Sequence, residues 1–190
     1  MSMIDETFGC VNNTIRLRSG LYFDLADPKP DQFTFADIAG ALSKICRFGG
    51  QCEWFYSVAE HSYHCAMVAA SDGLPNEIQR AVLLHDAAEA FCGDMVKPLK
   101  VMMPDYSIVE KKVEAVIAEK YGVDFSSPKV REIDWAMLIA ERRRLFSADG
   151  VVWTGEDKVR KLSPKIMRWF PIDAEMFFVI RARELGICTE

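Results

Sequence analysis

The stretch NEIQRAVLLHDAAEAFCGD, residues 76–94, decides the class of fold. Its apolar residues recur every three or four positions, which predicts one amphipathic helix from Asn76 to Phe91 with a buried face. His85 and Asp86 stand side by side in the middle of this otherwise apolar helix. They are either a hydrogen-bonding pair that supports the fold or two ligands of a metal ion.

The same helical pattern recurs in other segments, separated by Gly, Pro or Ser residues that start or end helices. A helix is predicted over residues 35–48, with Thr34 as its N-cap. The remaining predicted helices are 57–70 (SVAEHSYHCAMVAA), 106–122 (YSIVEKKVEAVIAEKYG), 127–146 (SPKVREIDWAMLIAERRRLF) and 173–186 (DAEMFFVIRARELG), the last capped by Asp173.

Ahead of the helices, TIRLRSGLYFDL (residues 14–25) alternates apolar and polar residues around Ser19-Gly20, which predicts a short β-hairpin. No repeat or linker divides the chain, and 190 residues suit one hydrophobic core. We therefore predict a single all-α domain with this hairpin at its start. Its parts are an N-terminal hairpin and loop (1–33), a helical core (34–148), and a connector with the C-terminal helix (149–190).

Composition excludes several classes of function. The net charge of −5 offers no basic surface for nucleic acid, so a polyanionic substrate would need a local cluster of arginine, lysine or metal. Six scattered cysteines without a C-x-x-C pair favour free thiols in a reducing compartment. The N-terminus lacks a signal-peptide pattern, and no apolar run reaches the roughly 18 residues of a membrane span. We expect a cytoplasmic protein that binds neither nucleic acid nor membranes.

Polar residues interrupt the buried face of three predicted helices: His61 in the first, His85-Asp86 in the second and Asp134 in the third. A buried carboxylate without a partner costs several kcal/mol. A divalent metal held by two imidazoles and two carboxylates would satisfy all of them. Each residue also has an ordinary structural explanation, such as a pairing of the aspartate with Arg142 or Arg143. The spacing alone leaves both interpretations open.

Several motifs together resemble the HD-domain metal phosphohydrolases. They are RFGGQ (47–51), SVAEHS (57–62), LLHDAAEAFCGD (83–94), MVKPLK (95–100) and EIDWAMLIAE (132–141). Their ordered pattern, H…HDxxE…D, extends over residues 38–146 and is most similar to that of bacterial deoxynucleoside 5′-nucleotidases and phage dATP triphosphohydrolases. The resemblance implies an HD-type helical bundle with one divalent transition metal (Mn, Co or Zn), and additional Mg with a triphosphate substrate.

The same resemblance assigns roles to individual residues. The implied metal ligands are His61, His85, Asp86 and Asp134. Glu89 would position or activate the attacking water, Asp94 would contact the sugar or assist the chemistry, and Arg47 would grip phosphate. Phe48 takes the place of an aromatic, often tryptophan, near the sugar or base. Lys97 and Lys100 would add positive charge for binding the substrate. His64 forms H-x-x-H with His61, which could indicate a different metal pair, but we predict a structural role for it beside the site. Glu53 and Glu60 are predicted to be solvated or pocket-edge charges. Residues 141–144 (Glu-Arg-Arg-Arg) are predicted to form a solvent-facing surface, with the alternative that one of the arginines reaches phosphate in an oligomer.

The predicted function is hydrolysis of a small deoxynucleotide. The leading hypothesis is a dNTP triphosphohydrolase that releases deoxynucleoside and triphosphate, because Lys97 and Lys100 could meet the extra phosphates. The alternative reaction is a deoxynucleoside 5′-monophosphatase. A hypothesis from another class is a nucleotide-binding sensor without turnover, which would not need Glu89. Relatives in the resembled family usually form homo-oligomers, and Phe177 and Phe178 of the last helix offer either an interface or core.

Overall fold

The structure, a computed structural model, describes residues 13–188 and is mostly helical, as the sequence predicts. The predicted free thiol of Cys10 lies outside these residues. The helices are α1 (Phe35–Leu42), α2 (Val58–Ser71), α3 (Asn76–Leu84), α4 (Glu89–Cys92), α5 (Lys97–Met102), α6 (Pro104–Tyr121), α7 (Pro128–Leu145) and α8 (Pro171–Glu184). Short 3-10 turns lie at η1 (Pro30–Gln32), η2 (Arg47–Gly50) and η3 (Glu156–Lys158).

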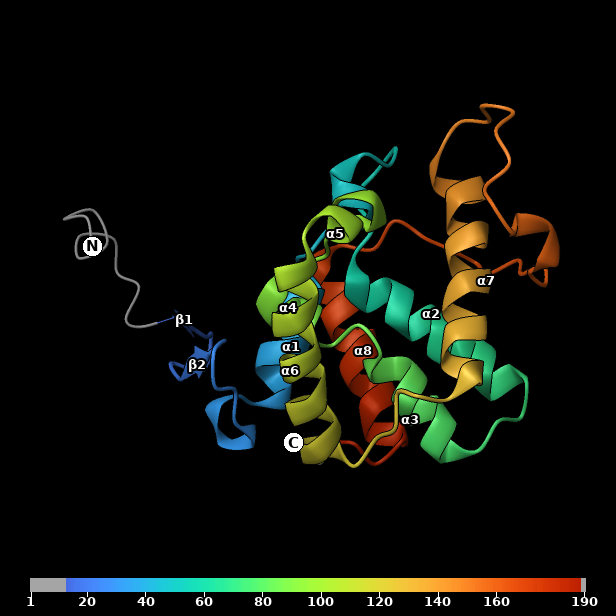
Figure 1. Ribbon diagram of the computed structural model, residues 1–190. Helices are drawn as coiled ribbons and strands as arrows, with labels where there is room; N and C mark the ends of the chain where they lie inside the picture. Colours follow the sequence, from blue (N-terminus) through green and yellow to red (C-terminus); the bar gives the residue numbers. More distant parts are fainter. Residues whose placement is uncertain (1–12, 189–190) are drawn as a thin grey trace.

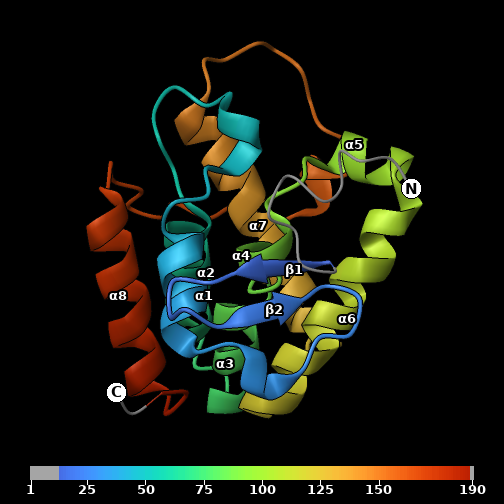
Figure 2. The same cartoon turned by 90° about the vertical axis from the view of Figure 1, so that its left-hand side faces the viewer.

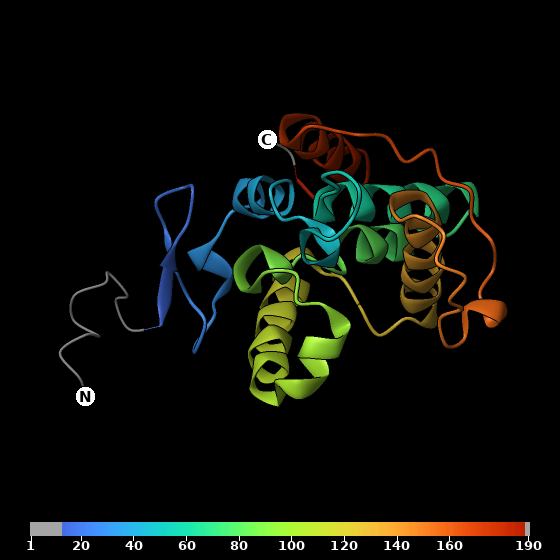
Figure 3. The same ribbon diagram turned by 90° about the horizontal axis from the view of Figure 1, so that it is seen from above.

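The predicted hairpin is confirmed. Strands β1 (Thr14–Arg16) and β2 (Tyr22–Asp24) pair antiparallel around a turn in which Gly20 has a positive φ of 91°. Figures 1 and 3 show the hairpin at one end of the molecule, beside the helices. Phe23 of β2 is fully buried and stacks on Phe91, with ring centroids 4.1 Å apart. This aromatic contact joins the hairpin to the segment that follows the His-Asp pair.

Helix α2 is the centre of the helical packing and contacts α3, α7 and α8 (Figure 1). Its inward face and the first turns of α7 enclose an apolar cluster with Ile133 and Met137. Helix α8 covers the opposite side of α2, and its Phe178 is fully buried in the core, whereas Phe177 stacks on Trp169. Histidines and carboxylates that face inward from α2, α3 and α7 are therefore brought together.

The predicted helix over 76–91 does not run through. Helix α3 ends at Leu84, the chain forms tight turns over residues 85–88, and α4 begins at Glu89. In these turns the backbone N–H of Glu89 donates to the carbonyl of Asp86 at 3.0 Å, a three-residue spacing. The α-helical hydrogen-bond pattern therefore stops at the His85-Asp86 pair and resumes after it.

The predicted helix over 35–48 also ends early, at Leu42. Residues beyond it pair with an extended segment instead: the N–H of Arg47 donates to the carbonyl of Tyr56, and the N–H of Val58 donates to that of Ile45. At the C-terminus, α8 starts at Pro171 with Phe170 as N-cap, so Asp173 is not the cap; its carboxylate accepts from the N–H of Phe170. Figure 2 shows α5, which the sequence analysis leaves unassigned, at the N-terminal end of α6.

The five cysteines among residues 13–188 are free thiols, as predicted. Within the same residues, no helix combines the length and the apolar character needed to cross a membrane.

Thr34 supplies a testable contribution to stability. Its hydroxyl accepts from the N–H of Asp37 at the start of α1, and the Asp37 carboxylate accepts from the N–H of Thr34. We expect Thr34→Ala to lower the free energy of unfolding by about 1 kcal/mol, because the first turn loses its cap. Urea denaturation of Thr34→Ala and of Thr34→Ser, which keeps the hydroxyl, measures the effect. Equal midpoints for both variants would contradict the capping role.

Candidate metal centre

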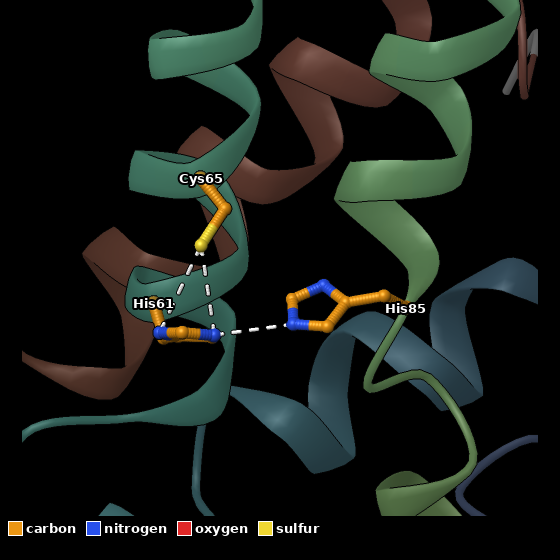
Figure 4. Close-up of side chains that lie close together, drawn as sticks. All are labelled: His61, Cys65 and His85. Atoms are coloured by element: carbon orange, nitrogen blue, oxygen red, sulfur yellow. Dashed lines mark hydrogen bonds between the residues drawn. The ribbon is translucent and has the colours of Figure 1, made fainter. Parts of the chain in front are cut away.

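Four predicted ligands from three helical regions converge on one point. His61 lies in the first turn of α2, His85 and Asp86 in the turn after α3, and Asp134 in the second turn of α7. The His61 Nε2 atom lies 3.2 Å from His85 Nε2, 3.5 Å from Asp86 Oδ2 and 3.3 Å from Asp134 Oδ1. The His85 Nε2 atom lies 3.3 Å from the same Asp86 oxygen and 3.6 Å from the same Asp134 oxygen. Figure 4 shows the two imidazole rings with their Nε2 atoms facing each other.

These separations fit a divalent transition metal. Ligand atoms at about 2.1 Å from a tetrahedral zinc ion lie roughly 3.4 Å from one another. The five measured separations, 3.2–3.6 Å, cluster around that value. Two imidazole nitrogens and two carboxylate oxygens are also a donor set that Mn, Co and Zn accept. The histidine–histidine and histidine–aspartate separations therefore suit such an ion.

The carboxylates are less buried than the sequence analysis assumes. His61 is fully buried and the His85 side chain is 8% exposed, but the side chains of Asp86 and Asp134 are 19% and 39% exposed. The centre thus has a closed histidine side and an aspartate side that is open to solvent. An open side is what a site needs if substrate and water are to reach the metal.

Electrostatics favours charged carboxylates here. Burial raises the pKa of Asp134, but hydrogen bonds from His61 and His85 outweigh it and hold that pKa well below its ordinary value. Burial lowers the pKa of His85, and the neighbouring Asp86 and Asp134 reverse the shift, so the net pKa of His85 is raised. The aspartates therefore attract positive charge to the point between the four side chains.

The outer nitrogen of each ring is already engaged. His85 Nδ1 lies 2.7 Å from the carbonyl oxygen of Val82, which can only accept, so Nδ1 donates and Nε2 is left for a metal. His61 Nδ1 lies 2.5 Å from an oxygen of Glu141. Both rings thus present Nε2 to the centre.

Cys65 of α2, one turn after His61, is a further candidate ligand that the sequence motifs do not identify. Its sulfur lies 3.6 Å from His61 Nε2, and His61, Cys65 and His85 form a group with all three donor atoms within 4.8 Å (Figure 4). Burial raises the pKa of the thiol to about 11. Metals bind the thiolate, so the carboxylates, which contact both histidines, are the better ligands. The spacing of four residues from His61 is the signal that could have identified Cys65.

Arg47 and Glu89 both reach the centre. Arg47 is buried, with Nη1 3.0 Å from Asp86 Oδ2 and Nε 3.3 Å from Glu141 Oε2. Glu89 has a buried Oε2 atom that finds no hydrogen-bond partner within residues 13–188. Burial, Asp86 and Asp94 raise the pKa of Glu89 well above its ordinary value. Burial also raises the pKa of Asp94, and the positive charge of Arg47 opposes this rise. Asp94 therefore lies near the same groups.

The other predicted substrate residues differ in how near they lie to the centre. Phe48 packs edge-on against Phe146, with centroids 5.1 Å apart, and the centre of its ring lies 5.6 Å from the guanidinium carbon of Arg47. Lys100 forms an ion pair with Glu110 and lies over the ring of Tyr106. Lys97 is exposed at the start of α5. The structure brings together the four predicted ligands, Arg47, Glu89 and Asp94, with Phe48 beside Arg47, whereas Lys100 is held by Glu110.

Two carboxylates assigned to the surface are fully buried: Glu60 and Glu141. Glu141 follows Asp134 by seven residues on the same face of α7, and this spacing could have identified it. His64 is also buried; it lies 3.5 Å from Glu60 and stacks on Trp169, away from the four ligands.

The arginines of the 141–144 run have their own partners. Arg142 and Arg143 pair with Glu156 rather than with Asp134, so the alternative in which Asp134 is a partner of these arginines is wrong. Asp134 instead contacts His61 and His85.

Comparison with known proteins agrees with this geometry. The family model described as HD domain matches residues 51–133, which include His61, His85, Asp86 and Glu89 and end one residue before Asp134. The protein named "Uncharacterized protein YfdR" of Escherichia coli (strain K12) is 42% identical over 140 residues, which cover 73% of this chain and 76% of that protein. The "Uncharacterized protein RCAP_rcc00048" of Rhodobacter capsulatus is 30% identical over 165 residues, 83% of this chain and 84% of that protein.

HD domains are in general metal-dependent hydrolases that bind a divalent metal, which accords with the convergent donor atoms described above. The chain belongs to the HD-domain family, together with YfdR of Escherichia coli.

Proposed function

We propose that this protein is a metal-dependent phosphohydrolase that acts on deoxynucleotides. The observation that carries the proposal is the convergence of four donor atoms. The Nε2 atoms of His61 and His85 lie 3.2 Å apart, and Asp86 Oδ2 and Asp134 Oδ1 each lie 3.3–3.6 Å from both of them. Arg47 and Glu89 lie beside these ligands. A metal site that is open on one side, an arginine and an unpartnered carboxylate are the parts that hydrolysis of a phosphate ester requires.

When bound by these four side chains, a divalent ion supplies Lewis acidity toward phosphoryl oxygens and makes a nearby water more acidic. Arg47 offers a planar guanidinium that neutralises charge growing on the phosphoryl oxygens. Glu89 accepts a proton from the attacking water, and burial together with Asp86 raises its pKa, which makes the carboxylate a stronger base. The water oxygen forms the new bond to phosphorus as the bond to the leaving group breaks.

Charge around the centre bears on the choice between mono- and triphosphate. The triphosphate hypothesis relies on Lys97 and Lys100, but Lys100 is paired with Glu110. Among the described residues, the one arginine or lysine that forms an ion pair with a proposed metal ligand is Arg47, which pairs with Asp86. One guanidinium matches a single phosphate better than three, so this pairing favours the deoxynucleoside 5′-monophosphatase reaction over the dNTP triphosphohydrolase.

A substrate screen tests the proposal. Deoxynucleoside 5′-mono- and triphosphates of the four common bases are offered to the protein with Mn²⁺, Co²⁺, Zn²⁺ or Mg²⁺. Release of inorganic phosphate from a monophosphate supports the 5′-monophosphatase, and release of triphosphate from a dNTP supports the triphosphohydrolase. Binding of a nucleotide without turnover under every metal would contradict the enzyme and favour a sensor.

Arg47 provides a separate prediction. Arg47→Lys keeps the positive charge beside Asp86 and Glu141 but loses the planar fork. We expect KM for the substrate to rise about tenfold or more, because a charge-assisted hydrogen bond to phosphate is worth roughly 1.5–3 kcal/mol. Steady-state kinetics measures the change, with the exposed Arg131→Lys on α7 as the matched control. An unchanged KM together with a lower melting temperature would make Arg47 structural.

A further inference from the structure

Glu141 lies behind the metal centre and is fully buried on α7. One of its oxygens lies 2.5 Å from His61 Nδ1 and accepts from the hydroxyl of Tyr56 at 2.8 Å. Its other oxygen lies 3.3 Å from Arg47 Nε. No solvent reaches this carboxylate, so its interactions are with these three side chains, which come from α2 and from residues 47–56.

The contact with His61 has a defined direction. Glu141 accepts a hydrogen bond from the Tyr56 hydroxyl, and its other oxygen lies beside the buried guanidinium of Arg47, a positive charge that keeps the carboxylate ionised. An ionised carboxylate only accepts hydrogen bonds, so His61 Nδ1 must carry a proton and donate it. In the neutral ring the lone pair is then on Nε2, which faces His85, Asp86 and Asp134.

Glu141 also reaches a second ligand through Arg47. The Arg47 guanidinium contacts Glu141 with Nε and Asp86 with Nη1. His85 differs, because its Nδ1 is held by a backbone carbonyl of its own segment. The orientation of two of the four ligands therefore depends on one carboxylate that sequence reasoning places on the surface.

We propose that Glu141 is a positioning residue that holds His61 with Nε2 toward the metal and fixes Asp86 through Arg47, and so strengthens metal binding. The inference rests on the metal site of the proposed function but not on any substrate. Partners that orient a metal-ligating histidine typically change metal affinity by about 10- to 100-fold when they are removed. A carboxylate that only neutralises Arg47 would affect folding without such a change.

The test is calorimetric titration of the full-length protein with Mn²⁺. We expect Glu141→Gln, which keeps the shape but loses the charge, to bind Mn²⁺ about 10- to 100-fold more weakly than the wild type. The matched control is Glu60→Gln, since Glu60 is equally buried on α2 but its side chain faces His64. In the Co²⁺-loaded protein, the visible absorption spectrum should shift in Glu141→Gln and stay unchanged in Glu60→Gln.

Tyr56→Phe keeps the inference testable if Glu141→Gln does not fold. It removes one hydrogen bond to Glu141 and should weaken Mn²⁺ binding by about 2- to 10-fold. Wild-type affinity in folded Glu141→Gln, or in Tyr56→Phe when the first variant does not fold, would overturn the positioning role. A wild type that binds no divalent metal would instead overturn the proposed function and this inference together.

Discussion

Asp86→Ala is expected to abolish both metal binding and turnover. The substitution removes an oxygen that lies 3.5 Å and 3.3 Å from the two histidine Nε2 atoms, and the remaining donors no longer enclose the ion. Metal participation in phosphoryl transfer is worth several kcal/mol, and 1.36 kcal/mol is tenfold in rate, so turnover should fall by about a thousandfold or more. Titration with Mn²⁺ and assays of phosphate release measure the two losses on one sample.

The fold should survive this change. Asp86 is partly exposed, and Arg47 keeps its ion pair with Glu141 when Asp86 is removed. Asp72→Ala, which removes a surface carboxylate paired with Arg160, is the control for loss of an aspartate as such. Turnover at the wild-type rate by metal-free Asp86→Ala would contradict the metal-dependent mechanism.

Glu89→Gln is expected to keep the metal and lose most of the turnover. Among residues 13–188 the carboxylate forms no ion pair with a histidine ligand, and its buried Oε2 has no hydrogen-bond partner, so the amide can replace it without disturbing the four donors. General-base catalysis contributes about 10²- to 10⁴-fold, and kcat should fall within that range. Steady-state kinetics at saturating metal gives kcat, and titration with Mn²⁺ gives the affinity.

Glu114→Gln is the matched control for Glu89. Its pKa is also raised by burial and by a neighbouring carboxylate, Glu110, but it lies on α6 and forms no ion pair with the four ligands. We expect its kcat to stay within about twofold of the wild type, since surface and edge substitutions rarely exceed 0.5 kcal/mol. A kcat for Glu89→Gln equal to that of Glu114→Gln would remove Glu89 from the proton transfer.

Most helices and the hairpin could be predicted because their signals are local. Apolar spacing marks the buried face of α2 and α7, Thr34 starts α1, and the Ser19-Gly20 turn closes the hairpin. The break after Leu84 has no strong local signal, since residues 81–91 contain neither Gly nor Pro and are mostly Ala, Leu and Glu. Tertiary contacts of His85 and Asp86 with α2 and α7 accompany this break.

The residues of the candidate site also differ in whether a local sequence pattern identifies them. His61, His85, Asp86 and Asp134 stand out because they interrupt apolar faces or complete an ordered motif. Glu141 does not, because it opens a run of three arginines that is typical of a solvated helix surface. Its burial depends on Tyr56, His61 and Arg47, which lie 80 or more residues earlier in the chain. Such long-range contacts are absent from any local pattern.

The most direct test of the central claim is metal-dependent turnover measured against metal occupancy. Protein stripped with a chelator is titrated with Mn²⁺, and phosphate release from the best deoxynucleotide of the screen is followed at each step. We predict no activity in the stripped protein and a rate that rises with occupancy and saturates at one ion per chain. Full activity without metal, or no turnover of any deoxynucleotide at full occupancy, would contradict the account.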